Sequence, residues 1–193
     1  MNGDTKLLAF AGSTRSESHN QKLMRLVAKA AESAGAEVTM LALADLALPL
    51  YDGDLEQADG IPEGGLRLKA AIAGHDGLLI ASPEYNGGLS AVLKNALDWA
   101  SRRDGDEPAL ASYKGKVAAI IGASPGRLGG ARGLIALRQV LTSCGVLVIP
   151  TQFALAEAHK AFDGAGELTN PAHRATVDNI AKSLVETADR LKA

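Results

Sequence analysis

The amino-acid sequence predicts a three-layer α/β sandwich, in which helices cover both faces of a five-stranded parallel sheet. Short apolar runs alternate with longer segments whose apolar residues recur at helical spacing, as in repeated strand–helix–strand units. Hydrophobic residues make up 47% of the chain and aromatic residues only 4%, which suits alanine- and leucine-rich helices packed on a buried sheet. A length of 193 residues suits one compact domain, so we expect residues 1–193 to form a single unit.

Five segments are expected to be buried parallel strands, because each is short, apolar and bounded by glycine or polar residues. They are residues 7–11, 37–41, 77–81, 117–121 and 146–149. Polar, glycine-rich loops follow the first, third and fourth of these strands. The carboxyl ends of parallel strands meet at one edge of a sheet, where open α/β sheets bind their ligands. The sequence therefore predicts a ligand site at that edge.

Helices are expected between these strands and after the last one. The predicted helices cover about residues 20–34, 66–73, 89–103 and 131–144, and a final helix begins at Pro171. Proline suits the first turn of a helix because its missing N–H would have no partner there. Residues 45–65 contain Pro49, Pro62 and four glycines, so we expect a loop in this region.

Charge and cysteine content exclude several classes of function. The net charge of −2 gives neither the basic surplus of a nucleic-acid-binding protein nor the strongly acidic face of a dedicated electron carrier. The single cysteine, Cys144, excludes an internal disulfide framework and a cysteine-based metal cluster. It shares the helical spacing of Leu137 and Leu141, so we expect a buried side chain and not a redox thiol.

The sequence also carries no targeting signal that we can identify. No run of about 18 apolar residues is present, and residues 1–6 lead into an apolar strand without the pattern of a secretory leader. We therefore expect a cytoplasmic protein that binds neither membrane nor nucleic acid.

The loop after the first strand is suited to bind a phosphate group. It reads Gly12-Ser13-Thr14-Arg15-Ser16-Glu17-Ser18-His19-Asn20 and leads into a predicted helix. Hydroxyl groups, one guanidinium and the free amides of a helix N-terminus are together the groups that bind a phosphate dianion. The glycine patterns of the P-loop and of dinucleotide-binding folds are absent. Helix capping by Ser18 or Asn20 is the simpler interpretation, and the two are compatible.

The loop after the third strand is suited to contact the edge of a flat heteroaromatic ring. It reads Ser82-Pro83-Glu84-Tyr85-Asn86-Gly87-Gly88. Pro83 stiffens the backbone, Gly87 and Gly88 allow a close approach, and Tyr85 can border a ring face. A solvent-exposed loop that caps the next helix is the alternative.

These motifs, in this order, resemble the NAD(P)H-dependent FMN reductase family, which includes bacterial chromate and quinone reductases and the related azoreductases. The resemblance rests on Gly-Ser-x-Arg-x-x-Ser-x-Asn from residue 12, Pro-Glu-Tyr-Asn from residue 83 and Leu-Lys-Asn-Ala-Leu-Asp-Trp from residue 93, and it covers nearly the whole chain. It implies a flavodoxin-like fold with bound FMN. It also implies ping-pong hydride transfer from NADPH or NADH to a small acceptor such as a quinone, azo compound, chromate or free flavin.

The resemblance also assigns cofactor-binding residues. It implies that Ser13, Thr14, Arg15, Ser18, His19 and Asn20 surround the FMN phosphate, that Pro83, Glu84, Tyr85, Asn86 and Gly87 line the isoalloxazine ring, and that Ala123 and Ser124 approach the ring by their backbone. No catalytic side chain and no metal ligand are expected, because a flavin itself performs the bond making. The chain departs from the common family pattern at Ser90-Ala91, where Pro-Gly is frequent, and at His19, where an apolar residue is common.

The helix predicted over residues 89–103 bears on assembly. Val92 and Trp99 form an apolar shoulder beside its core stripe, which suggests a subunit interface, and the family is commonly dimeric or tetrameric. We therefore expect a homodimer or homotetramer with Trp99 at or near the interface. The alternative is that Trp99 closes the edge of the core.

Two other functions stay open at this point. The chain could be a flavodoxin-type electron-transfer module, or a flavin-binding module without catalysis. The sequence favours neither NADH nor NADPH, and it does not identify the acceptor.

Overall fold

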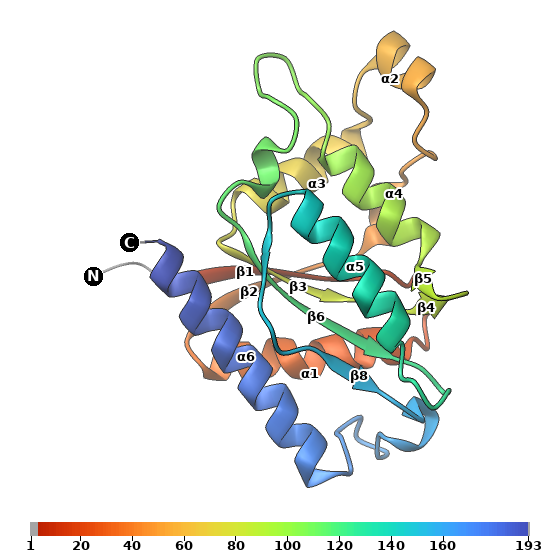
Figure 1. Cartoon of the computed structure of the whole chain (residues 1–193), viewed down its shortest axis with the longest axis vertical. Helices are drawn as coiled ribbons and strands as arrows, with labels where there is room; N and C mark the ends of the chain where they lie inside the picture. Colours follow the sequence, from red (N-terminus) through yellow and green to blue (C-terminus); the bar gives the residue numbers. More distant parts are fainter. Residues whose placement is uncertain (1–3, 193) are drawn as a thin grey trace.

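The computed structural model describes residues 4–192 and shows one sheet between two layers of helices (Figure 1). The strands of this sheet are β1 (Thr5–Ala11), β2 (Ala36–Leu41), β3 (Gly77–Ala81), β6 (Val117–Ala123), β7 (Leu147–Val148) and β8 (Phe153–Leu155). Their order is β2-β1-β3-β6-β7, with β8 also paired to β6, and every pairing is parallel. The predicted α/β class and the parallel sheet are confirmed.

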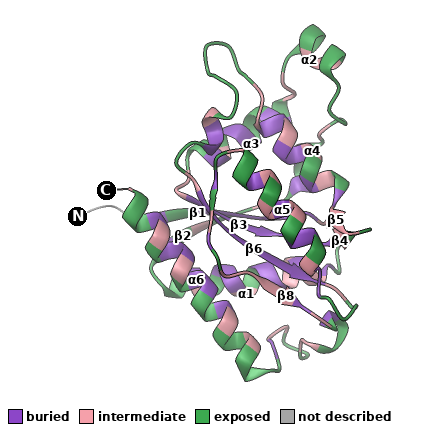
Figure 2. Cartoon of the chain, in the orientation of Figure 1, coloured by how far each residue is buried: buried purple, intermediate pink, exposed green. Residues whose placement is uncertain are grey.

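Helices cover both faces of the sheet. α1 (His19–Ser33) and α6 (Pro171–Leu191) lie on one face, and α3 (Glu63–Ala73), α4 (Ala91–Ala100) and α5 (Ala131–Ser143) lie on the other (Figure 1). Along β1, Leu7 and Ala9 join the core under α1 and α6, whereas Leu8 and Phe10 join the core under the other helices. The central strands are therefore buried on both faces, as Figure 2 shows, which explains their continuous apolar sequences.

The fifth position of the sheet is built from two short strands. β7 pairs with the first residues of β6, and β8 pairs with Ile121–Ala123, where the chain returns to the sheet. Pro150 lies between them and has no N–H to donate to β6. The carbonyl oxygens of Val148 and Pro150 accept hydrogen bonds from the Arg138 guanidinium on α5, at 3.1 and 3.4 Å. The strand predicted over residues 146–149 was thus incomplete, because β8 was missed.

The region predicted as a loop over residues 45–65 contains helical structure. The 3₁₀ helix η1 (Leu43–Leu46) precedes α2 (Gly53–Asp59), which projects from the body, and α3 begins at Glu63 (Figure 1). α2 buries none of its residues, so it has no apolar stripe by which a sequence pattern could reveal it. Its N-cap is Asp52, whose Oδ1 accepts a hydrogen bond from the Asp54 amide at 2.8 Å. The loop prediction was wrong for α2.

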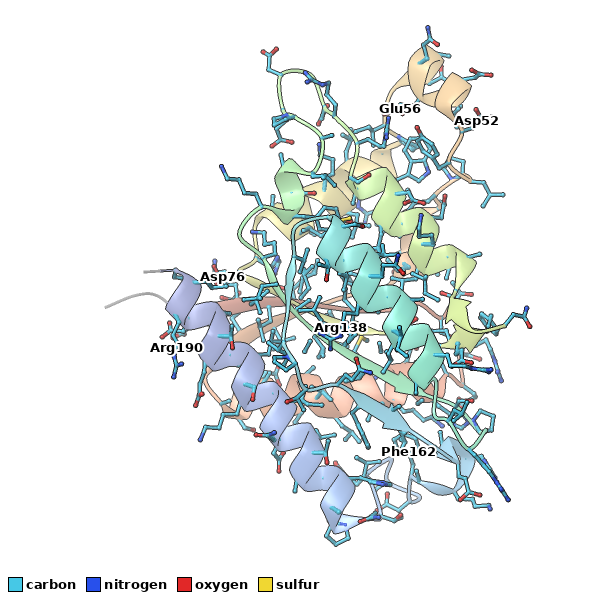
Figure 3. The ribbon with its side chains drawn as sticks, viewed as in Figure 1. Asp52, Glu56, Asp76, Arg138, Phe162 and Arg190 are labelled. Carbon is cyan, nitrogen blue, oxygen red and sulfur yellow. The ribbon has the colours of Figure 1, made fainter. Side chains whose placement is uncertain are left out.

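The Asp76 side chain connects Lys192, which follows α6, to Lys6 at the amino end of β1. Its Oδ2 accepts a hydrogen bond from the Lys6 amide at 2.7 Å and lies 2.8 Å from Nζ of Lys192. Burial raises the pKa of the Asp76 carboxyl, but hydrogen bonds from Lys192 and Lys6 outweigh burial and hold that pKa below its ordinary value. Figure 3 shows Asp76 near the two described ends of the chain, and Figure 1 shows β4 and β5 at the opposite end of the strands.

Asp76→Asn should destabilise the fold in a pH-dependent way. A carboxyl whose pKa is lower in the folded than in the unfolded chain stabilises the fold above about pH 4, and this stabilisation is lost as the pH falls through the lower, folded value. We expect the variant to lose about 1 kcal/mol of unfolding free energy at pH 7 and less at pH 3. Urea unfolding at both values measures the difference, and an equal loss at both would contradict this assignment.

Within residues 4–192, no helix combines the length and the apolar character needed to cross a bilayer.

Candidate active site

The carboxyl ends of β1, β3 and β6 open into one depression on the surface. The residues that line it come from three loops and are Ser13, Arg15, Ser18, His19, Asn20, Pro83, Glu84, Tyr85, Ala123, Ser124 and Pro125. All but Pro125 were predicted from the sequence to bind the cofactor, and Pro125 directly follows Ser124 in the loop after β6. Of the predicted residues, Thr14 lines an adjacent cavity together with Ser13, while Asn86 and Gly87 form a turn beside the depression.

The first loop presents unpaired backbone amides. Within the described chain, the amides of residues 13–17 donate no hydrogen bond, and amides in the first turn of any helix have no carbonyl partner. The Arg15 side chain is exposed beside them. The loop starts at Gly12, where a Cβ atom would lie only 2.8 Å from Cβ of Leu93 and from Oγ of Ser90. Only glycine therefore allows the loop to lie this close to α4.

Ser18 caps the helix that follows the first loop. It is the N-cap of α1, and its Oγ accepts a hydrogen bond from the Gln21 amide at 3.3 Å. The capping interpretation is thus confirmed for Ser18, and its contact with a phosphate stays a prediction.

Asn20 connects the first loop to the third. Its side chain is 4% exposed. Its Nδ2 donates to the carbonyl oxygen of Ala123 and its Oδ1 accepts from the Ala123 amide, both at 2.9 Å. This pair of bonds fixes the backbone at the end of β6 against the start of α1. A direct contact between Asn20 and the FMN phosphate stays a prediction, since Nδ2 still has one hydrogen to donate.

The second loop is a small hairpin. β4 (Glu84–Tyr85) and β5 (Gly88–Leu89) are antiparallel, and Asn86 and Gly87 form the turn with φ angles of 52° and 83°. Asn-Gly is the favoured pair for such two-residue turns, because both positions need positive φ. This segment was predicted only as a loop, although Asn86-Gly87 was a signal for the hairpin.

The Glu84 carboxylate joins this hairpin to α5. Its Oε2 accepts from the amides of Arg132 and Gly133 at 3.0 and 3.2 Å, and its Oε1 accepts from Nε of Arg132 at 2.7 Å. Burial raises the pKa of Glu84, but these hydrogen bonds outweigh burial, so the pKa lies below its ordinary value. The carboxylate is therefore charged at neutral pH and held by α5, while the rest of the residue lines the depression.

Ser90 connects α4 to the first loop. It is the N-cap of α4, and its Oγ donates to the carbonyl oxygen of Gly12 at 2.6 Å and accepts from the Leu93 amide at 3.3 Å. Ser90 stands where the sequence analysis noted a departure from the family pattern, and a proline there could make neither bond. A serine before a predicted helix is a typical N-cap, so this role could have been predicted from the sequence, whereas the hydrogen bond to Gly12 could not.

His19 contacts a fourth segment that the sequence analysis did not connect with the site. Its ring stacks on Phe162, which Figure 3 labels, with 6.3 Å between centroids and 2° between planes. Just before Phe162, the Ala158 amide donates to the Ser124 carbonyl oxygen at 3.0 Å. Burial, together with the positive charges of Lys22 and Arg15, lowers the pKa of His19. His19 is therefore neutral at pH 7 and packs the first loop against the segment after β8.

The Trp99 side chain is not available to contact another subunit, so the prediction that Trp99 itself lies at an interface was wrong, while an interface near it stays a prediction. The side chain is 0% exposed within the single chain, its Nε1 donates to the Pro49 carbonyl oxygen at 2.8 Å, and its ring packs against that of Tyr51 in a T-shaped arrangement with 5.0 Å between centroids. The segment around Pro49 covers the shoulder of α4, which is why the indole looked unpaired in the helical pattern. The alternative interpretation, that Trp99 closes the edge of the core, is confirmed.

Cys144 has the properties of a structural residue. It is the half-buried C-cap of α5, and burial raises the pKa of its thiol, which disfavours the reactive thiolate. Among the described side chains, His, Cys, Asp and Glu form no group of three that could hold a metal ion.

Comparison with known proteins identifies relatives over most of the chain. The profile of a family described as NADPH-dependent FMN reductase matches residues 5–160. An NAD(P)H-dependent FMN reductase of Pseudomonas aeruginosa is 37% identical over an alignment of length 196 that covers 100% of both chains. A quinone reductase of Pseudomonas putida is 35% identical over 175 residues, covering 88% of this chain and 89% of the relative.

A solved structure of a flavoenzyme is also similar to this chain. FerB, a flavoenzyme NAD(P)H:(acceptor) oxidoreductase from Paracoccus denitrificans, superimposes with a TM-score of 0.79 at 31% identity, over 96% of this chain and 98% of FerB. This likeness confirms the flavodoxin-like architecture that the sequence motifs implied.

Proposed function

The chain belongs to the NADPH-dependent FMN reductase family of oxidoreductases, and on that premise we propose that it binds FMN in the depression at the ends of β1, β3 and β6. There it transfers hydride from NADPH or NADH to a small acceptor. One observation carries this proposal: predicted cofactor-binding residues from three separate loops line a single depression. We place quinones first among acceptors because curated relatives are quinone reductases, ahead of azo compounds, chromate and free flavin.

The first loop fits the phosphate end of FMN. Its free amides, the Ser13 hydroxyl and the Arg15 guanidinium are hydrogen-bond donors, as a dianion requires, and they lie at the positive end of α1. Glu17 is the one acidic residue of this loop, and its carboxylate is bound by Nζ of Lys22 at 2.8 Å. The loop therefore suits a terminal phosphate.

The second and third loops fit the ring end. When bound, FMN supplies the two-electron hydride chemistry. The hairpin contributes Glu84 and the half-exposed Tyr85 to the lining of the depression, and Ala123 and Ser124 line it as well. Backbone N–H groups of the hairpin turn are suited to stabilise negative charge that gathers on a reduced ring, whereas the amides of Ala123 and Ser124 already donate to Oδ1 of Asn20 and to the Leu155 carbonyl oxygen. The role of the chain is therefore to hold the ring, leave one face open and stabilise that charge.

Two experiments test this proposal. Heating the purified protein and identifying the released ligand by mass should give FMN, and FAD from most of the protein would contradict it. The FMN-loaded protein should then oxidise NADPH or NADH rapidly in the presence of a quinone. A flavodoxin-type carrier or a non-catalytic flavin-binding module would bind FMN but leave the nicotinamide unoxidised.

Arg15→Ala should weaken FMN binding while leaving the fold intact. Arg15 is exposed and makes no contact that the core needs, and a hydrogen bond to a charged group contributes about 1.5–3 kcal/mol. The dissociation constant for FMN should therefore rise by about 10- to 150-fold, as measured by titrating the apoprotein and following flavin fluorescence. Arg190→Ala, on the exposed surface of α6, is the matched control. Equal affinities of both variants and the wild type would remove Arg15 from the site.

We also propose that residues 1–193 act as one domain in the cytoplasm and form a homodimer or homotetramer. The exposed apolar side chains of Leu50 and Ile135, at 78% and 65%, are candidates for the contact in place of Trp99. Sedimentation at several protein concentrations measures the assembly, and a monomer throughout would reject it.

A further inference from the structure

The hairpin of β4 and β5 is too short to be stable by itself. Each of its strands has two residues, and an isolated two-stranded hairpin is marginally stable at best in water. Tyr85 and Asn86 at its tip are exposed, so the tip buries little apolar surface. Yet this hairpin carries much of the proposed ring-binding surface. Contacts with another part of the chain must therefore hold the hairpin in position.

The Glu84 carboxylate and the start of α5 provide that support. Both carboxylate oxygens are bound, one by the amides of Arg132 and Gly133 and the other by the Arg132 guanidinium. The helix also lies very close to the hairpin, since a Cβ atom on Gly133 would be 3.1 Å from the Gly88 carbonyl oxygen and from Cβ of Glu84. The Glu84 side chain is only 8% exposed, whereas that of Arg132 is 62% exposed and is not among the residues lining the depression.

From this geometry we infer that Arg132 is a positioning residue of the flavin site, which acts through Glu84 by holding the hairpin against α5. The inference rests on the proposed function, because it concerns the affinity and potential of the FMN bound there. The two backbone amides alone would still bind Glu84, but Arg132 adds a charged partner in fixed geometry. The main-chain bonds set the location of the hairpin, and Arg132 sets how firmly it is held.

The pair also has an electrostatic consequence. Glu84 is a buried carboxylate in the loop that borders the proposed ring, and an unpaired negative charge there would oppose the negative charge that a reduced flavin gathers. The Arg132 guanidinium and the positive end of α5 neutralise it. Loss of Arg132 should therefore weaken FMN binding and also make the flavin reduction potential more negative. A purely structural role would not produce the second effect.

A double-mutant cycle tests whether Arg132 acts through Glu84. The variants are Arg132→Ala, Arg132→Lys, Glu84→Gln and the double variant, with Arg190→Ala as control; Figure 3 shows Arg190 on α6, far from the hairpin. Arg132→Ala should raise the FMN dissociation constant about tenfold in the wild-type background and less than about threefold in the Glu84→Gln background. Arg132→Lys should be intermediate, because it keeps the charge but loses the planar fork. Equal effects of Arg132→Ala in both backgrounds, or no effect in either, would overturn the inference.

Two further measurements separate this inference from the proposed function. The reduction potential of the bound flavin should fall in Arg132→Ala and return toward the wild-type value in the double variant. In the FMN-free protein, the amides of residues 84–89 should exchange hydrogen faster in Arg132→Ala than in wild type, and unchanged exchange would reject the anchoring role. If the wild type binds no FMN, the proposed function fails, but the exchange experiment still decides whether Arg132 holds the hairpin.

Discussion

Trp99→Glu is expected to unfold the chain, and not merely to separate subunits. The indole is completely buried between α4 and the segment around Pro49, so the new carboxylate would lie in an apolar environment without a partner. Loss of a large buried aromatic side chain alone costs about 3–5 kcal/mol, and most domains have only about 5–15 kcal/mol of stability. Urea unfolding followed by circular dichroism should show little or no folded variant at pH 7.

Trp99→Phe is the matched variant. It keeps a buried ring but removes the N–H that donates to the Pro49 carbonyl oxygen, which still accepts a hydrogen bond from Nδ2 of Asn95 at 2.8 Å. We expect it to fold with a loss of about 1–3 kcal/mol. A Trp99→Glu protein that stays folded but becomes monomeric would instead restore the interface interpretation.

Asn20→Ala should weaken both the fold and FMN binding. The substitution leaves the N–H and the carbonyl oxygen of Ala123 without their partner, and each unsatisfied buried group costs about 1–3 kcal/mol. We therefore expect the unfolding free energy to fall by about 2–4 kcal/mol. FMN affinity should fall as well, because the loop after β6 loses its tie to α1. Urea unfolding and FMN titration of the same preparation measure the two effects.

Asn170→Ala is the matched control for Asn20→Ala. Asn170 is the exposed N-cap of α6, where its Oδ1 accepts from the Ala172 amide at 2.9 Å, so its loss should cost about 1 kcal/mol and leave FMN affinity unchanged. If Asn20→Ala lost FMN affinity with no loss of stability, Asn20 would act on the phosphate directly and not by holding Ala123.

The sequence was most informative where burial is continuous. β3 lies at Gly77–Ala81 as predicted, and α6 begins at Pro171, because a strand buried on both faces and a proline at a first helical turn each have a strong local pattern. The edge that carries the site followed from the alternation of strands and helices. Local patterns failed for α2 and β8, since α2 buries no side chain and a proline interrupts the fifth position of the sheet.

The connections within the site were beyond sequence reasoning for a different reason. Asn20 and Ala123 are 103 positions apart, and Ser90 and Gly12 are 78 apart, so no local spacing links either pair. Motifs predicted which residues gather at the depression. They did not predict that Asn20, Glu84 and Ser90 have side chains engaged in holding neighbouring loops together, because those bonds form only when the tertiary fold brings the partners together.

The closeness of the two described ends makes this chain suitable for rearrangement. Nζ of Lys192 donates to the Asp4 carbonyl oxygen at 3.1 Å, and both ends lie across the molecule from β4 and β5 (Figure 1). A short glycine-rich peptide could therefore join the ends, and new termini could be opened in the exposed turn around Gly105, as circular permutation requires. The same geometry would let the protein be attached to an electrode by either end while its proposed flavin site faces the solution.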